Sequence, residues 1–205
     1  MTEESLNKPT VGILAYGSLI SNPDREIENA STRIVKDVMT PFHVEFARSS
    51  DRRGDAPTLV PVEQGGAHVK GQVFVVDLPE QEAANILYRR EINQVGSDRN
   101  YARPEEITDK KVLIERLTNF AGLDIVLYTQ IAATIKPLTP ERLAGLAIES
   151  VVKAKPGRDG ITYLIDAKRH GIITALSPAY ETEILQKTGC ETLEDALANL
   201  LNAAN

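Results

Sequence analysis

Four residues near the start of the chain, Tyr16, Gly17, Ser18 and Leu19, form a short turn directly after the apolar run Val11 to Ala15. A buried strand that ends at a glycine leaves successive backbone N–H groups without a partner in the sheet. Such donors can bind a carboxylate, or the oxyanion that develops when a carbonyl carbon is attacked. The same residues also fit an ordinary strand-to-loop junction, in which Gly17 supplies a permissive backbone and Ser18 caps the next element.

Glu91 is the candidate for moving protons. A helix is expected over residues 79–92, where a proline and acidic residues precede an apolar stripe. On this helix Leu87 and Glu91 share the face that must pack on the sheet. Burial makes a carboxyl group easier to protonate, so an inward Glu91 could both accept and donate a proton. In the alternative interpretation, Glu91 pairs with Arg89 or Arg90, or lies in solvent at the end of the helix.

A third set of candidates lies in the polar loop within residues 47–61, which joins two apolar segments. Loops fixed by strands often carry binding residues, and Arg53 could make a forked contact to a substrate carboxylate. Alternatively, the loop is a solvated hairpin turn in which Asp51, Asp55 and the arginines satisfy one another.

The elements that must position these residues fall into two groups along the chain. Short β-type segments dominate the first part, at residues 11–15, 32–38, 42–48, 57–62, 67–77 and 124–132. Helical patterns follow Pro137, at residues 141–154, 159–169, 179–187 and 192–203. The chain is therefore expected to be α+β. A small mixed β-barrel or sheet with one packing helix would occupy residues 1–136, and residues 137–205 would form a helical extension packed on the same domain, with Tyr163 and Tyr180 as packing residues.

Composition limits the classes of function. The 205 residues are 42% hydrophobic and carry a net charge of −6, which supplies no basic surface for a nucleic acid. Cys190 is the only cysteine, so no internal disulfide is possible. The polar start of the chain and the lack of a long apolar segment predict a cytoplasmic protein without a membrane span. No metal or other cofactor is expected, because the three histidines lie far apart in the sequence: His43, His68 and His170.

Taken in order, three motifs resemble the gamma-glutamylcyclotransferase-like family over residues 11–132: Tyr16-Gly17-Ser18-Leu19, Ser49-Ser50-Asp51-Arg52-Arg53-Gly54, and Glu91. The resemblance implies a mixed α and β fold around a small barrel. It also implies cleavage of a gamma-glutamyl amide with release of 5-oxoproline, a reaction at the border of transferase and lyase chemistry that takes part in glutathione metabolism and uses no cofactor. By the same resemblance Glu91 is catalytic, and the substrate-binding residues are Tyr16, Gly17, Ser18, Leu19, Ser50, Arg53 and Tyr128.

The substrate itself is left open by the sequence. The glutathione-cleaving branch continues its first turn with an aromatic residue and follows the catalytic glutamate with Gly-Gly-Tyr, whereas here Ile20 and Ile92 occupy those places. Another gamma-glutamyl amine is one alternative. A non-catalytic module of the same fold, which binds a small molecule or a protein partner, is the other. The sequence does not fix the oligomeric state, and Tyr128 would fit a half-buried strand position as well as a binding role.

Overall fold

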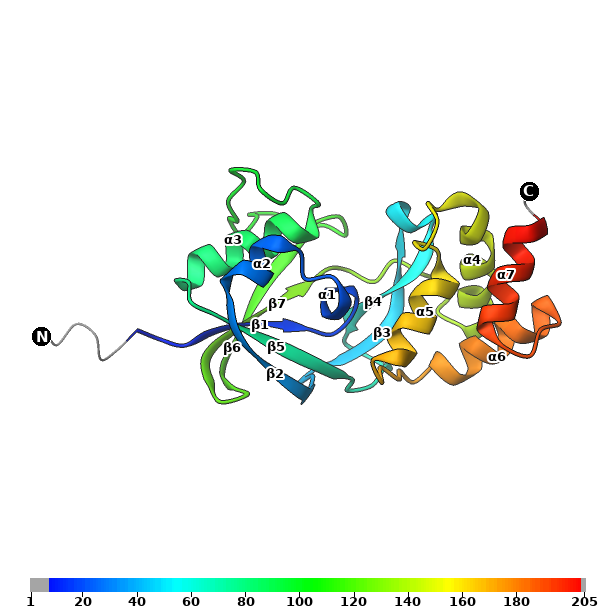
Figure 1. The fold of residues 1–205 in the computed structure, drawn as a ribbon, viewed down its shortest axis with the longest axis horizontal. Helices are drawn as coiled ribbons and strands as arrows, with labels where there is room; N and C mark the ends of the chain where they lie inside the picture. The colour runs from blue at the N-terminus through cyan, green and yellow to red at the C-terminus, as the bar shows by residue number, and fades with distance from the viewer. Residues whose placement is uncertain (1–7, 204–205) are drawn as a thin grey trace, which may run out of the picture. The chain divides into compact units, whose positions relative to one another are not determined.

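The computed structural model describes residues 8–203 of the chain (Figure 1). Two compact units are present, one formed by residues 8–38 and 71–131 and the other by residues 39–70 and 132–203. This grouping places residues 39–70 with the C-terminal helices, whereas the sequence predicted a split between residues 136 and 137. The predicted domain at residues 1–136, with a helical extension over residues 137–205 packed on it, stays a prediction.

The first unit is built on a five-stranded sheet with the strand order β2–β5–β1–β7–β6. The central strand β1 is buried along its whole length, runs antiparallel to β5 and runs parallel to β7. The strands and helices of this part of the chain are β1 (Val11–Ala15), α1 (Ser18–Ser21), α2 (Arg25–Ala30), β2 (Ser31–Met39), β5 (Lys70–Val76), α3 (Glu80–Glu91), β6 (Leu113–Phe120) and β7 (Leu123–Gln130).

One face of this sheet carries the three helices. Alternate residues of β1 point to this face, as the two-residue period of a strand requires, and they share an apolar core with α1, α2 and α3. Figure 1 shows α3 lying over the sheet beside α2. Each helix contributes a buried side chain to the core, namely Leu19, Ile27 and Leu87. Burial of these side chains holds each helix on the sheet, and so helps to position the polar residues at the helix ends.

The second unit combines an antiparallel hairpin with four helices. The hairpin consists of β3 (His43–Ser50), the 3-10 turn η2 (Asp51–Arg53) and β4 (Ala56–Val62), and the helices are α4 (Pro140–Lys153), α5 (Gly160–Arg169), α6 (Ser177–Thr188) and α7 (Leu193–Ala203). Gly54 closes the turn with a positive φ of 63°, and a Cβ there would lie 2.8 Å from the amide nitrogen of Ala154. Glycine is therefore needed at this position on both counts.

The core of the second unit is aromatic. Phe46 packs edge-on against Tyr180 with ring centroids 5.4 Å apart, and against Tyr163 at 6.0 Å. Both tyrosines are buried, so their predicted packing roles are confirmed. Burial raises the pKa of Tyr180 well above the ordinary tyrosine range, and the nearby negative charge of Asp159 adds to this effect.

A buried carboxylate joins the hairpin to the loop before α6. Glu45 is 1% exposed. Its Oε1 accepts from the amide of Phe46 at 2.9 Å and from the hydroxyl of Thr174 at 2.5 Å, and its Oε2 accepts from the amide of Leu176 at 3.0 Å. Three hydrogen bonds to one buried carboxylate offset much of the cost of removing it from water.

The predicted α+β class is confirmed, and so are the predicted strands and helices, within a few residues at their ends. The helices α1 and α2, the 3-10 turn η2 and the strand β6 were not predicted. Among the described residues the strands form an open sheet, with β2 and β6 at its edges, and a separate hairpin rather than a closed barrel. Within residues 8–203 no helix is both long enough and apolar enough to cross a bilayer.

Candidate functional site

The strands β1 and β7 are parallel neighbours, so their C-terminal ends lie on the same side of the sheet. Tyr16 follows β1 directly, is 7% exposed, and donates its hydroxyl to the carbonyl of Thr129 on β7. This hydrogen bond ties the two strand ends together. The side chain of Tyr16 therefore has a structural role in holding the turn in place.

Tyr128 lies one residue before Thr129 and is paired across the sheet with Glu115 of β6. Partial burial raises the pKa of Tyr128, and the negative charge of Glu115 raises it further. The phenol therefore keeps its proton at neutral pH and is a hydrogen-bond donor. Arg103 holds Glu115 through two contacts, of 2.8 and 3.1 Å.

The predicted turn begins a single helical turn, α1. Gly17 precedes it with an extended φ of −164°, so a left-handed backbone is not the reason for a glycine here. The first N–H groups of any helix have no carbonyl partner within the helix, and these donors are the ones expected to face an anionic group. Leu19 is buried in the core of the first unit and so anchors the turn to the sheet.

Glu91 is the last residue of α3. Leu87, one turn earlier on the same face, is fully buried, and the side chain of Glu91 is 23% exposed. The side chain of Glu91 is therefore mostly buried, and its predicted catalytic role stays a prediction. Its Oε1 also accepts from Nη1 of Arg90 at 2.7 Å, so the ion pair of the alternative interpretation is present as well.

Arg90 is the residue that joins the turn to Glu91, and it was not among the predicted site residues. Its Nη2 donates to the hydroxyl oxygen of Ser18 at 3.1 Å and to the carbonyl of Asn22 at 3.0 Å, while Nη1 binds Glu91. Ser18 and Glu91 are thus held within the span of one guanidinium group. Sequence had indicated Arg90 only as one possible partner of Glu91.

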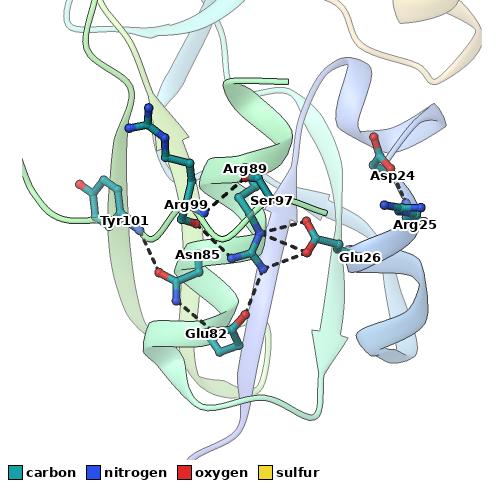
Figure 2. Close-up of polar contacts among 9 residues, drawn as sticks. All are labelled: Asp24, Arg25, Glu26, Glu82, Asn85, Arg89, Ser97, Arg99 and Tyr101. Atoms are coloured by element: carbon teal, nitrogen blue, oxygen red, sulfur yellow. Dashed lines mark hydrogen bonds and ion pairs between the residues drawn. The ribbon is translucent and has the colours of Figure 1, made fainter. Parts of the chain in front are cut away.

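A second arginine, Arg89, organises the surroundings of the site (Figure 2). It is buried, binds both carboxylate oxygens of Glu26 on α2 at 2.9–3.1 Å, and donates to Glu82 at 3.0 Å and to the carbonyl of Arg99 at 3.1 Å. The hydrogen bonds to Glu26 are the main reason that the pKa of Arg89 is raised. The network therefore attaches both α2 and the loop that follows Glu91 to α3.

The loop after Glu91 is held at further points along α3. Asn85 accepts from the amide of Tyr101 at 2.9 Å and donates to Glu82 at 2.9 Å (Figure 2). The hydrogen bond from Asn85 is the main reason that the pKa of Glu82 is lowered, with Arg89 the next. The ring of Tyr101 lies 5.4 Å from that of Tyr88, between centroids. These contacts hold the middle of residues 92–112, a segment with turns and bends but no helix or strand.

The connection between α1 and α2 is strained. Asp24 has a positive φ of 72°, which a non-glycine residue adopts at a cost of about 1–3 kcal/mol. Its carboxylate accepts from the amide of Arg25 at 2.6 Å and caps the start of α2 (Figure 2). Because Glu26 on the same short helix is bound by Arg89, the strain at Asp24 is offset by contacts to α3.

Ser50 and Arg53 belong to the second unit. Ser50 ends β3, and its carbonyl accepts from the amide of Asp55 at 3.0 Å. The guanidinium of Arg53 lies 4.4 Å from the ring centroid of Tyr163 and donates to the carbonyl of Arg158 at 3.4 Å. Their predicted contribution to the same site as Glu91 stays a prediction.

Two of the three histidines, which are distant in the sequence, meet in the structure. The rings of His43 and His68 meet edge-on at 4.5 Å between centroids, and Nδ1 of each bonds to a backbone carbonyl, of Gly65 and Thr40 respectively. Strand pairing in the second unit brings them together. Within residues 8–203 there is no group of three or more histidine, cysteine or acidic residues that could hold a metal ion.

Comparisons with known proteins add one finding. No family model matches the sequence, and no curated protein matches it. Among solved structures, the chain is similar to a selenomethionine-labelled gamma-glutamyl cyclotransferase specific to glutathione from yeast, with 15% sequence identity, 97% of this chain and 98% of that chain covered, and a TM-score of 0.47. The site as described rests on contacts within this chain.

Proposed function

We propose that this chain is a gamma-glutamyl cyclotransferase, which cleaves a gamma-glutamyl amide and releases 5-oxoproline. The observation that carries the proposal is the joining of Ser18 and Glu91 by Arg90. It holds a turn suited to bind an anion beside a largely enclosed carboxylate. Ser18 lies three residues after the end of β1, and Arg90 connects it to Glu91.

In this reaction the gamma-glutamyl part of the substrate is held at Tyr16–Leu19. Glu91 removes a proton from the substrate's α-amino group, and the nitrogen's electron pair attacks the substrate's own γ-carbonyl carbon. A C–N bond forms, and the carbonyl oxygen becomes an oxyanion that the N–H groups of the turn stabilise. Glu91 then returns the proton to the departing amine as the original amide bond breaks, which leaves the five-membered lactam.

Few protein groups are needed, because nucleophile and electrophile belong to one molecule. The main task is to fold the substrate so that the amine faces the carbonyl, which can supply much of the rate enhancement. Tyr128, whose raised pKa keeps it protonated, is assigned as a hydrogen-bond donor to the substrate. Ser50 and Arg53 are proposed to bind its carboxylate, and the scheme requires no cofactor.

The substrate is proposed to be a small gamma-glutamyl compound, glutathione or a related amine conjugate, in the cytoplasm. The acidic chain gives no support for a nucleic-acid partner. The competing candidate is a non-catalytic binding module of the same fold. The ion pair between Arg90 and Glu91 favours it, because a paired carboxylate also has a purely structural explanation.

The two candidates are separated by incubating the full chain with glutathione, gamma-glutamyl dipeptides and gamma-glutamyl amines, and measuring 5-oxoproline by mass spectrometry. Glu91→Gln keeps the shape of the side chain but cannot transfer a proton. We expect it to lower kcat by about 100-fold to 10,000-fold without changing the melting temperature. The matched control is Glu80→Gln on the same helix, whose exposed ion pair with Arg116 is distant from the site in sequence and costs little to lose.

A parent chain that releases no 5-oxoproline from any of these substrates contradicts the proposed function. So does a Glu91→Gln variant with parental kcat on a substrate that the parent cleaves. Binding of a gamma-glutamyl compound without turnover, unchanged by Glu91→Gln, would identify the binding module instead.

A further inference from the structure

The short helix α1 depends on side chains from outside it. A single helical turn of four residues is unstable alone, because the cost of nucleating a helix is not recovered in so few residues. The carbonyl groups at its C-terminal end find partners elsewhere: the carbonyl of Ile20 accepts from Gln72 at 3.3 Å, and that of Asn22 accepts from Nη2 of Arg90 at 3.0 Å. A guanidinium at the C-terminal end of a helix is electrostatically favourable.

The same guanidinium also contacts the other end of α1 and the end of α3. Nη2 reaches the hydroxyl of Ser18 at 3.1 Å, and Nη1 reaches Oε1 of Glu91 at 2.7 Å. Adjacent side chains on a helix normally point about 100° apart, so a contact between residues 90 and 91 is not a by-product of helix geometry. Arg90 is 14% exposed along its side chain, which shows that it is held in this arrangement rather than extended into water.

We propose that Arg90 is a positioning residue that sets the separation between the substrate-binding turn and Glu91. This inference rests on the proposed function. Arg90 does not need to contact the substrate, since it acts by holding Ser18 and Glu91 at the two sides of the reacting amide. Displacement of a catalytic group by about 1 Å can lower the rate on the order of 100-fold. A positioning residue can therefore affect the rate as much as a residue that contacts the substrate.

Arginine is suited to this position in a way that lysine is not. Its planar fork presents donors in fixed directions and can serve three acceptors at once, whereas a lysine ammonium is a compact charge on a flexible stem. The neighbouring arginine has a separate task, because Arg89 directs its guanidinium to Glu26, Glu82 and the carbonyl of Arg99. Consecutive residues thus hold different elements against the end of α3.

The test compares Arg90→Lys and Arg90→Gln with the parent in the full chain, using the substrate that the parent cleaves fastest. We expect both variants to lower kcat by about 10-fold to 100-fold with a smaller change in KM, and Arg90→Lys to rescue little of the loss although it keeps the charge. Arg116→Lys is the control, since that arginine makes an exposed ion pair with Glu80. Its kcat should stay within about twofold of the parent.

Two further measurements separate positioning from charge. In a double-mutant cycle, Ser18→Ala and Arg90→Gln should be less than additive in their effect on kcat, because both remove the same contact. Hydrogen exchange should become faster at residues 16–22 in Arg90→Gln but not in Arg116→Lys. This second readout requires no turnover.

The outcomes that overturn the inference are distinct from those that overturn the proposed function. An active parent whose Arg90 variants keep parental kcat removes the positioning role and leaves the reaction intact. Full rescue by Arg90→Lys would assign the effect to charge alone. Unchanged exchange at residues 16–22, or loss of the whole fold in both variants, would also contradict it. An inactive parent instead contradicts the proposed reaction.

Discussion

The two units of the molecule bury polar groups in different ways. In the first unit, buried charged side chains are paired with opposite charges: Arg89 binds Glu26 and Glu82, and Arg90 binds Glu91. In the second unit, the buried carboxylate of Glu45 is met by backbone amides and a hydroxyl. Charge pairs therefore lie around the candidate site, whereas neutral donors satisfy the buried carboxylate of the second unit.

The difference follows from what each unit has to hold in place. Helices α1 and α2 have four and six residues, and the loop over residues 92–112 has little regular structure, so these segments depend on side-chain contacts for their position. The helices α4–α7 have ten to fourteen residues and are stabilised by their own apolar faces. Functional segments are commonly those with the lowest local stability, which is consistent with a site in the first unit.

Removing Arg89 should have the largest effect on stability. Arg89→Met leaves the carboxylates of Glu26 and Glu82 without their cation, and we expect a loss of about 3 kcal/mol in the free energy of unfolding. Urea unfolding measures the loss, and hydrogen exchange should localise it to α2 and the start of the loop after Glu91. Arg116→Met is the control, because its ion pair is exposed on both sides and is worth little.

Acid should weaken the same network in the parent. The pKa of Glu82 is lowered from its ordinary value of 4.5, so its contribution is present above that pH and is lost as the pH falls through the lowered value. Arg89→Met should show a smaller loss over that range. An equal acid dependence in both proteins would mean that Arg89 contributes nothing to the acid dependence and that the bond from Asn85 accounts for it.

A smaller effect is expected from the buried carboxylate of the second unit. Glu45→Gln keeps the shape but turns one acceptor into a donor that faces an N–H or O–H group, and we expect a loss of about 2 kcal/mol in the free energy of unfolding. Amide hydrogen exchange should become faster in β3 and at residues 172–177. The exposed Glu63→Gln in the same unit should be neutral, and an equally neutral Glu45→Gln would show that hydrogen bonding at this carboxylate is not important.

The smallest expected change in the free energy of unfolding is an increase, produced by a substitution of Tyr180. Within residues 8–203, the Tyr180 hydroxyl is the buried side-chain polar atom that lacks a hydrogen-bond partner. Tyr180→Phe removes it and should raise the free energy of unfolding by about 1 kcal/mol at pH 7. Because burial raises the pKa of Tyr180, the parent should also lose stability as the pH rises above 10, where the unfolded tyrosine ionises, and the variant should lack this part of the loss. Thermal melts of parent and variant at pH 7 and above pH 10 measure both effects. A variant that is less stable than the parent at pH 7 would contradict the prediction.

Sequence patterns predicted the elements with long, clear periodicity. The buried strand β1, the helix α3 and the four C-terminal helices all have runs of apolar residues at the expected spacing. For the candidate site, the sequence indicated Ser18 and Glu91, which Arg90 contacts together, and their joint role in one site stays a prediction.

The rest had no local signal. Helices α1 and α2 are too short to show a helical period, and β6 is a sheet edge whose apolar residues are interrupted by Glu115 and Arg116. The role of Arg90 depends on α1 meeting the end of α3, a contact between residues about seventy positions apart that no local pattern encodes. The grouping of residues 39–70 with the C-terminal helices is equally a matter of long-range packing.

The place of β1 in the sheet has a consequence for how the chain folds. This strand lies near the start of the sequence, yet its register pairs Val11 with Val76 on one side and with Ile125 on the other. During synthesis β1 must wait for both partners, while the hairpin β3–β4 can form from local contacts before β7 is made. Sheets formed by pairing strands that are distant in the sequence fold slowly, and an apolar strand that is exposed until its partners arrive promotes aggregation. We therefore expect the emergence of β7 from the ribosome to be the step that commits the first unit to its native fold.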